Sequence, residues 1–143
     1  IGLNAKDMLG MTAFMYACHK GHQNVVKVLL NHSDRLELNA KSNRLGKTAF
    51  MFACTNGHKD IVKVLLNYPE IIDLNAREER GMTALMFASL CGHKDVVKVL
   101  LNYSKIIDLN ARDNFGLTAL MMAIDQRHQD IIQLIKPILR IYY

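Results

Sequence analysis

The sequence lacks any run approaching the roughly 20 consecutive apolar residues that a membrane-spanning helix requires. It does not open with a basic segment followed by an apolar stretch, so no secretion signal is expected. Charged residues make up only 22% of the chain, and the formal net charge of +5 is far below the density of a dedicated nucleic-acid-binding protein. The chain of 143 residues is half hydrophobic, which predicts one globular domain with a buried core.

Cysteine is also scarce. The three cysteines are an odd number with no Cys-x-x-Cys spacing, which argues against a disulfide framework. Cys18 and Cys54 occupy equivalent positions of a repeat and are expected to pack in the core, whereas Cys91 lies in a turn and is expected to be more exposed. Free thiols favour a reducing compartment, so we expect an intracellular, cytoplasmic protein, with the nucleus as the alternative.

Recognisable catalytic motifs are absent: there is no P-loop, dinucleotide-binding glycine run, His-Glu-x-x-His or Gly-x-Ser-x-Gly. One histidine recurs per repeat, at His22, His58, His93 and His128. Neighbouring repeats are separated by roughly one helix diameter, about 10 Å, so this row cannot converge on one metal ion. We therefore predict that these histidines bond backbone groups between repeats, and that the protein is not an enzyme and has no catalytic residues, cofactor or metal site.

The feature that dominates the sequence is repetition. Three short blocks return in the same order: Gly-x-Thr-Ala, Gly-His and Leu-Asn-Ala-Lys/Arg. The glycines of the first block are spaced by 36, 35 and 35 residues. The blocks begin at Gly10, Gly46, Gly81 and Gly116; at Gly21, Gly57 and Gly92, with Arg127 in place of the last glycine; and at Leu3, Leu38, Leu74 and Leu109.

Each unit predicts two short helices and an extended finger. The threonine of each Gly-x-Thr-Ala block precedes an alanine-containing apolar run, where a helix N-cap belongs. Gly21 is expected to end the first helix in a left-handed conformation. The second helix is expected from about His22 to Leu30, with Asn31 and its equivalents Asn67 and Asn102 as left-handed caps. Neither helix is stable alone, so each repeat must bury its apolar stripe against the next.

Together these blocks resemble the ankyrin repeat, a unit of about 33 residues with a β-turn finger and two antiparallel helices. The resemblance covers nearly the whole chain and implies an all-α solenoid of helix–turn–helix units with β-turn fingers. We expect one ankyrin-repeat domain over 1–143, with the tail of a preceding repeat at 1–5. The four repeats are expected at 6–40, 41–76, 77–111 and 112–143, the last with a C-terminal cap.

The sequence departs from the family's Thr-Pro-Leu-His pattern. Its proline is replaced by Ala13, Ala49, Ala84 and Ala119, and its histidine by Met15, Met51, Met86 and Met121. Methionine should substitute adaptable apolar packing for a hydrogen bond. The second finger has one extra residue, so the segment 41–45 is expected to protrude. Pro137 is expected to kink or stop the final helix.

The resemblance also implies a protein–protein interaction scaffold whose partner binds the concave face formed by the fingers and the first helix of each repeat. Twenty candidate residues follow by position, of which nine are apolar, four basic and two acidic. They are Met8, Leu9, Met11, His19 and Lys20; Arg44, Leu45, Lys47, Thr55 and Asn56; Glu79, Arg80, Met82, Leu90 and Cys91; and Asn114, Phe115, Leu117, Asp125 and Gln126. If exposed, the apolar members form a strip. We therefore expect a protein or peptide partner with apolar anchors and acidic character, bound to a monomer; the alternative is that these side chains fold inward within the fingers.

Three other interpretations stay open. The chain could be a structural segment of a longer ankyrin array, or an engineered, consensus-like repeat protein. A nucleic-acid partner is disfavoured, because the lysines along the second helices, such as Lys27, Lys63 and Lys98, have no aromatic platform among them for bases.

Overall fold

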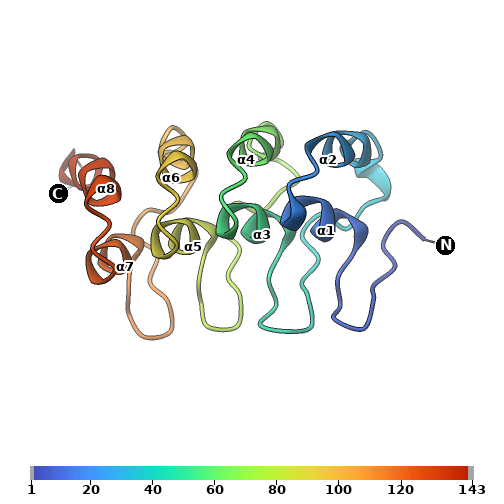
Figure 1. Ribbon diagram of the computed structural model, residues 1–143, viewed down its shortest axis with the longest axis horizontal. Helices are drawn as coiled ribbons and strands as arrows, with labels where there is room; N and C mark the ends of the chain where they lie inside the picture. The colour runs from blue at the N-terminus through green and yellow to red at the C-terminus, as the bar shows by residue number, and fades with distance from the viewer. Residues whose placement is uncertain (1, 142–143) are drawn as a thin grey trace.

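The computed structural model describes residues 2–141 of the chain, and side chains up to residue 139. In these described residues, eight α-helices form four stacked pairs, and one short 3-10 helix lies outside the pairs (Figure 1). The inner helices are α1 (Ala13–Lys20), α3 (Ala49–Thr55), α5 (Ala84–Leu90) and α7 (Ala119–Asp125). The outer helices are α2 (Gln23–Leu30), α4 (Lys59–Leu65), α6 (Lys94–Leu101) and α8 (Gln129–Ile141), and the 3-10 helix η1 (Ser33–Arg35) follows α2. The described residues contain no strand, which confirms the all-helical solenoid.

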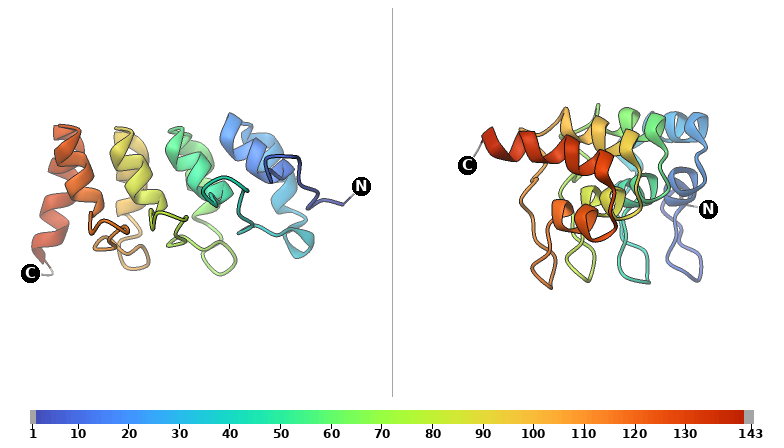
Figure 2. Two further views of the ribbon diagram at one scale, coloured as in Figure 1. Left: turned by 90° about the horizontal axis from the view of Figure 1, so that it is seen from below. Right: turned by 60° about the vertical axis from the view of Figure 1, so that its left-hand side comes forward.

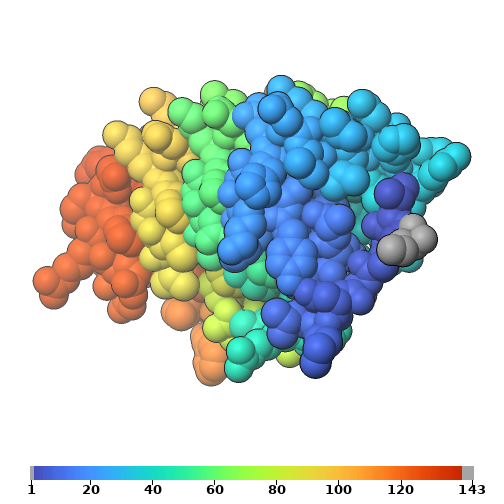
Figure 3. Space-filling model, turned by 45° about the vertical axis from the view of Figure 1, so that its right-hand side comes forward, coloured from blue at the N-terminus to red at the C-terminus, as the bar shows by residue number. Residues whose placement is uncertain are grey.

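The molecule is built in three rows: outer helices, inner helices, and finger loops that project away from both (Figures 1 and 2). The space-filling view shows the repeats as slabs side by side along the long axis (Figure 3). Each inner helix packs against the inner helix of the next repeat and against the outer helix of its own repeat. This nearest-neighbour arrangement is the one that repeat proteins require for stability.

Each inner helix starts at the threonine that the sequence predicts. The Thr12 side chain accepts a hydrogen bond from the backbone N–H of Met15 at 3.2 Å, and Thr48, Thr83 and Thr118 cap their helices in the same way. Gly21 ends α1 with a φ of 83°, the left-handed conformation that glycine accepts most easily. The methionines that replace the family histidine form the centre of the core, because Met15, Met51 and Met86 are each only 1% exposed.

The predicted left-handed asparagine caps are wrong. Asn31 and Asn102 both have a φ of −64°, and Leu66 rather than Asn67 caps α4. The chain instead makes one further right-handed turn. The backbone N–H groups of Asn31 and His32 bond to the carbonyls of Val28 and Leu29, so a left-handed residue is not needed to satisfy them.

Two further features differ from expectation. Pro137 does not stop α8, which continues to Ile141; the predicted kink stays a prediction. Pro137 lacks the N–H that would bond the carbonyl of Gln133, but both residues are exposed, so water can bond that carbonyl instead. The second finger ends at the level of the others (Figure 1). Its extra residue is absorbed at the tip, where Leu45 adopts a φ of 64° before Gly46 at 70°.

The Gly-His block joins consecutive repeats. The Nε2–H groups of His58, His93 and His128 donate to main-chain carbonyls of the preceding inner helix, at 2.8, 2.7 and 3.2 Å. The imidazole of each lies on the glycine of the preceding repeat. A Cβ added to Gly57 would stand 2.6 Å from Nδ1 of His93. The predicted role between repeats is therefore confirmed for His58, His93 and His128, but not for His22, which is exposed and makes no side-chain bond at the start of α2.

The asparagines of the first three Leu-Asn-Ala blocks form a second connection between repeats. The amide of Asn39 donates to the carbonyl of Ile71 at 3.0 Å and accepts from the N–H of Asp73 at 2.8 Å. Asn4 and Asn75 make the same pair of bonds to the next repeat. Hydrogen bonds from the recurring histidines and asparagines therefore connect consecutive repeats along two edges of the stack.

Candidate functional site

The candidate site is the concave face, which we define as the surface between the finger loops and the inner helices. Its shape depends on the fingers, and a short polar side chain holds each finger turn. Asp7 Oδ1 accepts from the N–H groups of Leu9 and Met11, both at 2.9 Å. Asp113 makes the same two bonds in the fourth finger, and Glu78 makes them in the third. These bonds fix the backbone at the tips and direct the tip side chains outward.

The first finger is also tied to its inner helix. The Tyr16 hydroxyl donates a hydrogen bond to Oδ2 of Asp7. This bond, with the backbone N–H of Met11, lowers the pKa of Asp7, and it raises the pKa of Tyr16. Asp7 is therefore committed to its own finger as a charged acceptor, although its side chain is open to water.

Neighbouring fingers are bonded to each other at their tips. Asn43 donates its backbone N–H to the carbonyl of Leu9 at 3.0 Å and its side-chain amide to that of Met8 at 3.2 Å. Asn114 repeats this pair with Arg80 and Glu79, at 2.9 Å in both cases. The fingers therefore form a connected row rather than four independent loops.

A row of large side chains covers the floor of the concave face. Tyr16, Phe52, Phe87 and Met122 occupy the same place in successive inner helices, four residues after the capping threonine. Phe87 and Met122 are buried, Phe52 is half-buried and Tyr16 is at the edge of exposure. The sequence-based site did not include this row; its signal was the recurrence of a bulky residue at one position in every repeat.

Lys47 lies across this row. Its Nζ is 5.0 Å from the ring centre of Phe52 and 4.3 Å from that of Phe87 in the next repeat. The same ammonium donates to the hydroxyl of Thr55 at 3.2 Å. Burial lowers the pKa of Lys47. A half-buried cation stacked on two aromatic faces is thus fixed in the middle of the site.

A hollow of about 330 Å³ opens beside Lys47, over the first two repeats. Its basic lining groups are Lys20, Arg44 and Lys47, and His19 lies among them. The His19 ring meets Phe52 edge-on, and burial lowers the pKa of His19. None of the described residues lining this hollow is acidic; the others are Leu9, Met11, Tyr16, Ser42, Leu45 and Phe52.

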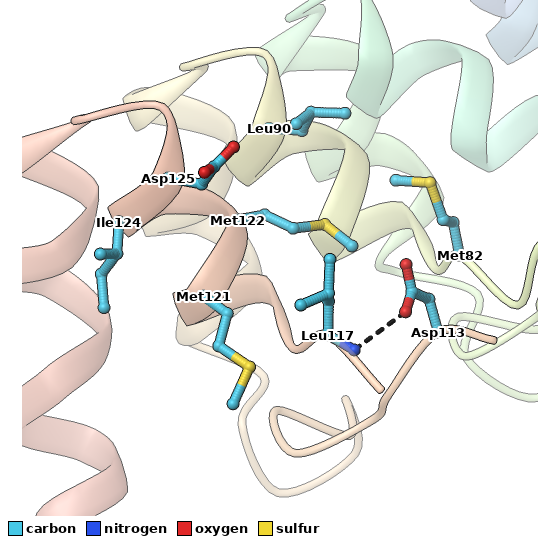
Figure 4. A pocket seen from close by; sticks show the side chains of 8 residues that line it. All are labelled: Met82, Leu90, Asp113, Leu117, Met121, Met122, Ile124 and Asp125. Carbon is cyan, nitrogen blue, oxygen red and sulfur yellow. Dashed lines mark hydrogen bonds between the residues drawn. The ribbon is translucent and has the colours of Figure 1, made fainter. Parts of the chain in front are cut away.

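A second hollow of about 500 Å³, lined mostly by apolar side chains, lies at the last two repeats (Figure 4). It is lined by Met82, Leu90, Asp113, Leu117, Met121, Met122, Ile124 and Asp125. Figure 4 shows Leu117 and Met122 on the side of α7 that faces Met82, with Met121 and Ile124 on the other side. The first group belongs to the concave face.

The exposure of Met121 and Ile124 is an effect of their place in the stack. Met121 is 40% exposed, whereas its equivalents in the three earlier repeats are each 1% exposed. Ile124 is 49% exposed, whereas its equivalents Cys18, Cys54 and Ser89 are fully covered. Within each earlier repeat the following repeat covers these positions, so their exposure in the fourth is not evidence of a partner site.

The structure divides the twenty predicted site residues by burial. Thirteen are exposed: Met8, Leu9, Lys20, Arg44, Asn56, Glu79, Arg80, Cys91, Asn114, Phe115, Leu117, Asp125 and Gln126. Five are half-buried: His19, Leu45, Lys47, Thr55 and Leu90. Met11 and Met82 are buried, at 8% and 5% exposure, because their side chains pack in the core, and each shows only a small part of its surface in a hollow. The expected continuous apolar strip is therefore broken at these two positions.

The other chemistry-bearing residues have structural surroundings. Cys18 and Cys54 are fully buried, and burial raises the pKa of Cys18 to about 12 and that of Cys54 still higher. Cys91 is exposed at the end of α5. Within residues 2–139, no group of three or more histidine, cysteine or acidic side chains is placed to hold a metal ion. No helix in the described part of the chain could cross a membrane.

Comparison with known proteins agrees with the geometry. A family model described as "Ankyrin repeats (3 copies)" matches residues 1–78 and 69–138, which together span nearly the whole chain. The protein therefore belongs to the ankyrin-repeat family. Ankyrin repeats are generally protein–protein interaction modules, and the proteins that contain them are generally non-enzymatic scaffolds. The search of curated proteins found no match.

Proposed function

We propose that this protein is a scaffold that holds a partner protein or peptide on its concave face, through apolar anchors on the partner and acidic groups beside them. The observation that supports this most directly is the presence of two open hollows that both reach the concave face. One hollow has basic groups and no acidic lining residue, and the other is mostly apolar. Exposed apolar side chains at the fingertips, above all Met8 at 96% and Phe115 at 81%, complete the surface.

The partner's charge follows from that of the face. Among the twenty predicted site residues, Lys20, Arg44, Lys47 and Arg80 are basic, against the acids Glu79 and Asp125. Arg80 is paired with Glu78 at 3.1 Å, which leaves the excess positive charge around the first hollow. A surface of this kind favours an acidic ligand and speeds its approach. We also propose an intracellular location, which agrees with three free cysteines.

The test is selection of random displayed peptides on the protein, compared with a variant that removes three exposed apolar groups from the face: Leu9→Ser, Phe115→Ser and Leu117→Ser. These side chains are 61%, 81% and 42% exposed, so their loss should leave the fold intact. Met82→Ser is unsuitable because Met82 is buried.

The matched control variant removes three exposed apolar groups elsewhere: Val28→Ser, Ile71→Ser and Ile106→Ser, at 58%, 41% and 48% exposure. We expect peptides selected on the unmodified protein to bind the control variant and to lose binding to the face variant, with equal far-UV circular dichroism in all three. Equal binding to the face and control variants would refute the concave face as the site.

A further inference from the structure

Lys47 differs in residue type from the residues at the equivalent position of the other three repeats. The residue between the finger glycine and the capping threonine is Met11 in the first repeat, Met82 in the third and Leu117 in the fourth. Only the second repeat has a charged side chain there. The two methionines are buried in the core, whereas the lysine is half-buried and lies on the concave face. An ionisable group at an otherwise apolar position carries a desolvation cost that the fold alone does not require.

The contacts of Lys47 satisfy its charge only in part. Two aromatic faces and one hydroxyl contact the ammonium, and these are weak substitutes for a carboxylate. Glu78, an acid whose charge acts on Lys47, is held elsewhere: its oxygens accept from the backbone N–H groups of Arg80 and Met82 and pair with the Arg80 guanidinium. In the described residues, the Lys47 ammonium makes no ion pair. It is therefore a fixed, pre-oriented cation that faces an open hollow.

The distance from the Lys47 ammonium to the second hollow sets a register for a bound segment. Lys47 lies at the junction of the second and third repeats, because it contacts Phe52 and Phe87. The cleft of Leu90, Leu117 and Met122 lies at the junction of the third and fourth. One repeat step is about 10 Å, the spacing of packed helices. An extended chain covers that distance in about three residues.

We propose that Lys47 receives an Asp or Glu side chain of the partner and that an aliphatic side chain about three residues away in the same extended segment enters the cleft of Leu90, Leu117 and Met122. This inference rests on the proposed function, since it names the ligand chemistry and register of the same face. It makes Lys47 the residue that determines specificity for an acidic segment.

The experiment uses the peptides selected on the unmodified protein and lost on the face variant. Each is synthesised with a fluorescent label, and its Kd is measured by anisotropy on the protein and on Lys47→Met, Lys47→Arg and Lys63→Met. Lys47→Met installs the residue that the first and third repeats already have there, so the fold should persist, which circular dichroism checks. Lys63→Met makes the same change on the exposed outer helix α4.

We expect the selected peptides to share an acidic residue about three positions from an aliphatic one. Lys47→Met should weaken their binding about tenfold or more, Lys47→Arg should restore part of it, and Lys63→Met should have no effect. Changing the acidic residue of the peptide to its amide should cause a similar loss on the unmodified protein and no further loss on Lys47→Met.

Two results would overturn the inference, and they are distinguishable. If face-dependent peptides bind Lys47→Met as tightly as the unmodified protein, the carboxylate contact is wrong and the proposed function stands. If no selected peptide distinguishes the face variant from its control, the proposed function fails and the role of Lys47 fails with it.

Discussion

The histidine that joins consecutive repeats offers the sharpest test of how this stack is stabilised. His93→Ala removes the 2.7 Å hydrogen bond from Nε2–H to the carbonyl of Thr55 and uncovers Gly57 beneath the ring. His22→Ala is the matched control: His22 occupies the same place in the first repeat, is exposed, and makes no side-chain bond at the start of α2. The two substitutions are chemically identical and differ only in whether a preceding repeat is present.

The expected magnitude follows from the geometry. The Thr55 carbonyl lies at a part-buried contact, so loss of its donor should cost about 1–3 kcal/mol of unfolding free energy. His22→Ala should stay within about 0.5 kcal/mol, as surface substitutions do. With a urea m-value of about 2 kcal/mol/M, the midpoint of His93→Ala should fall by about 0.5–1.5 M.

The reciprocal substitution Gly57→Ala adds a second expectation. The left-handed φ of 72° should cost about 1–2 kcal/mol for alanine, and the new Cβ would also clash with the His93 ring at 2.6 Å. In the double variant the ring is absent, so the combined loss should be smaller than the sum of the two single losses. Urea unfolding, monitored by circular dichroism, measures the four variants and the unmodified protein. Equal midpoints for His93→Ala and His22→Ala, or strictly additive losses in the double variant, would refute this account of the Gly-His block.

Three more outcomes follow from burial and bonding. In the folded protein, a colorimetric thiol reagent at neutral pH should modify Cys91 alone, because the other two cysteines are buried and their pKa is raised. All three cysteines should react in denaturant. Rapid reaction of a second thiol in the folded state would contradict this expectation. Met51→Ala should lower the free energy of unfolding in urea by about 2–5 kcal/mol and Met121→Ala by less than about 1 kcal/mol. Both residues occupy the same repeat position, but Met51 is 1% exposed and Met121 is 40% exposed. Equal losses would contradict the assignment of Met121 to an uncovered end of the stack. Asn75→Ala should cost about 1–3 kcal/mol through its two bonds to the next repeat, whereas Asn102→Ala on the surface should be near neutral in the same assay.

The elements fixed by short-range rules could be predicted from the sequence. A threonine before an apolar run predicts where each inner helix begins, and the structure places an N-cap at all four. The predictions that were wrong applied a local sequence rule at positions where the surrounding structure decides the outcome. Asparagine tolerates the left-handed cap, but the turn after α2 satisfies its carbonyls without one. Proline disfavours a helix interior, but α8 continues past Pro137.

The candidate site was predictable in outline and not in detail. The position of a residue within its repeat is enough to assign it to a finger or to an inner helix. Thirteen of the twenty residues predicted in this way for the concave face are exposed. Register does not show which way a side chain turns once the next repeat is in place. Met11 and Met82 turn inward, and Lys47 at the same position turns onto Phe87 of the following repeat. That contact joins residues forty positions apart, and it depends on the packing of two repeats.

Positions that hold the same residue in every repeat and positions that vary between repeats have different physical roles. Residues that recur in every interior repeat, such as the joining histidines and asparagines, bond across repeat boundaries and therefore stabilise the stack whatever the protein binds. Residues that differ between repeats at one register position, such as Lys47 against Met82, cannot be required by the common architecture, because another repeat folds without them. When the residue type at one repeat position differs between repeats of the same chain, that difference points to a role in ligand specificity rather than in folding. It follows that Lys47→Met and His93→Ala should separate cleanly: the first should alter ligand binding with little loss of stability, and the second should lower stability while the remaining folded protein keeps its ligand preference.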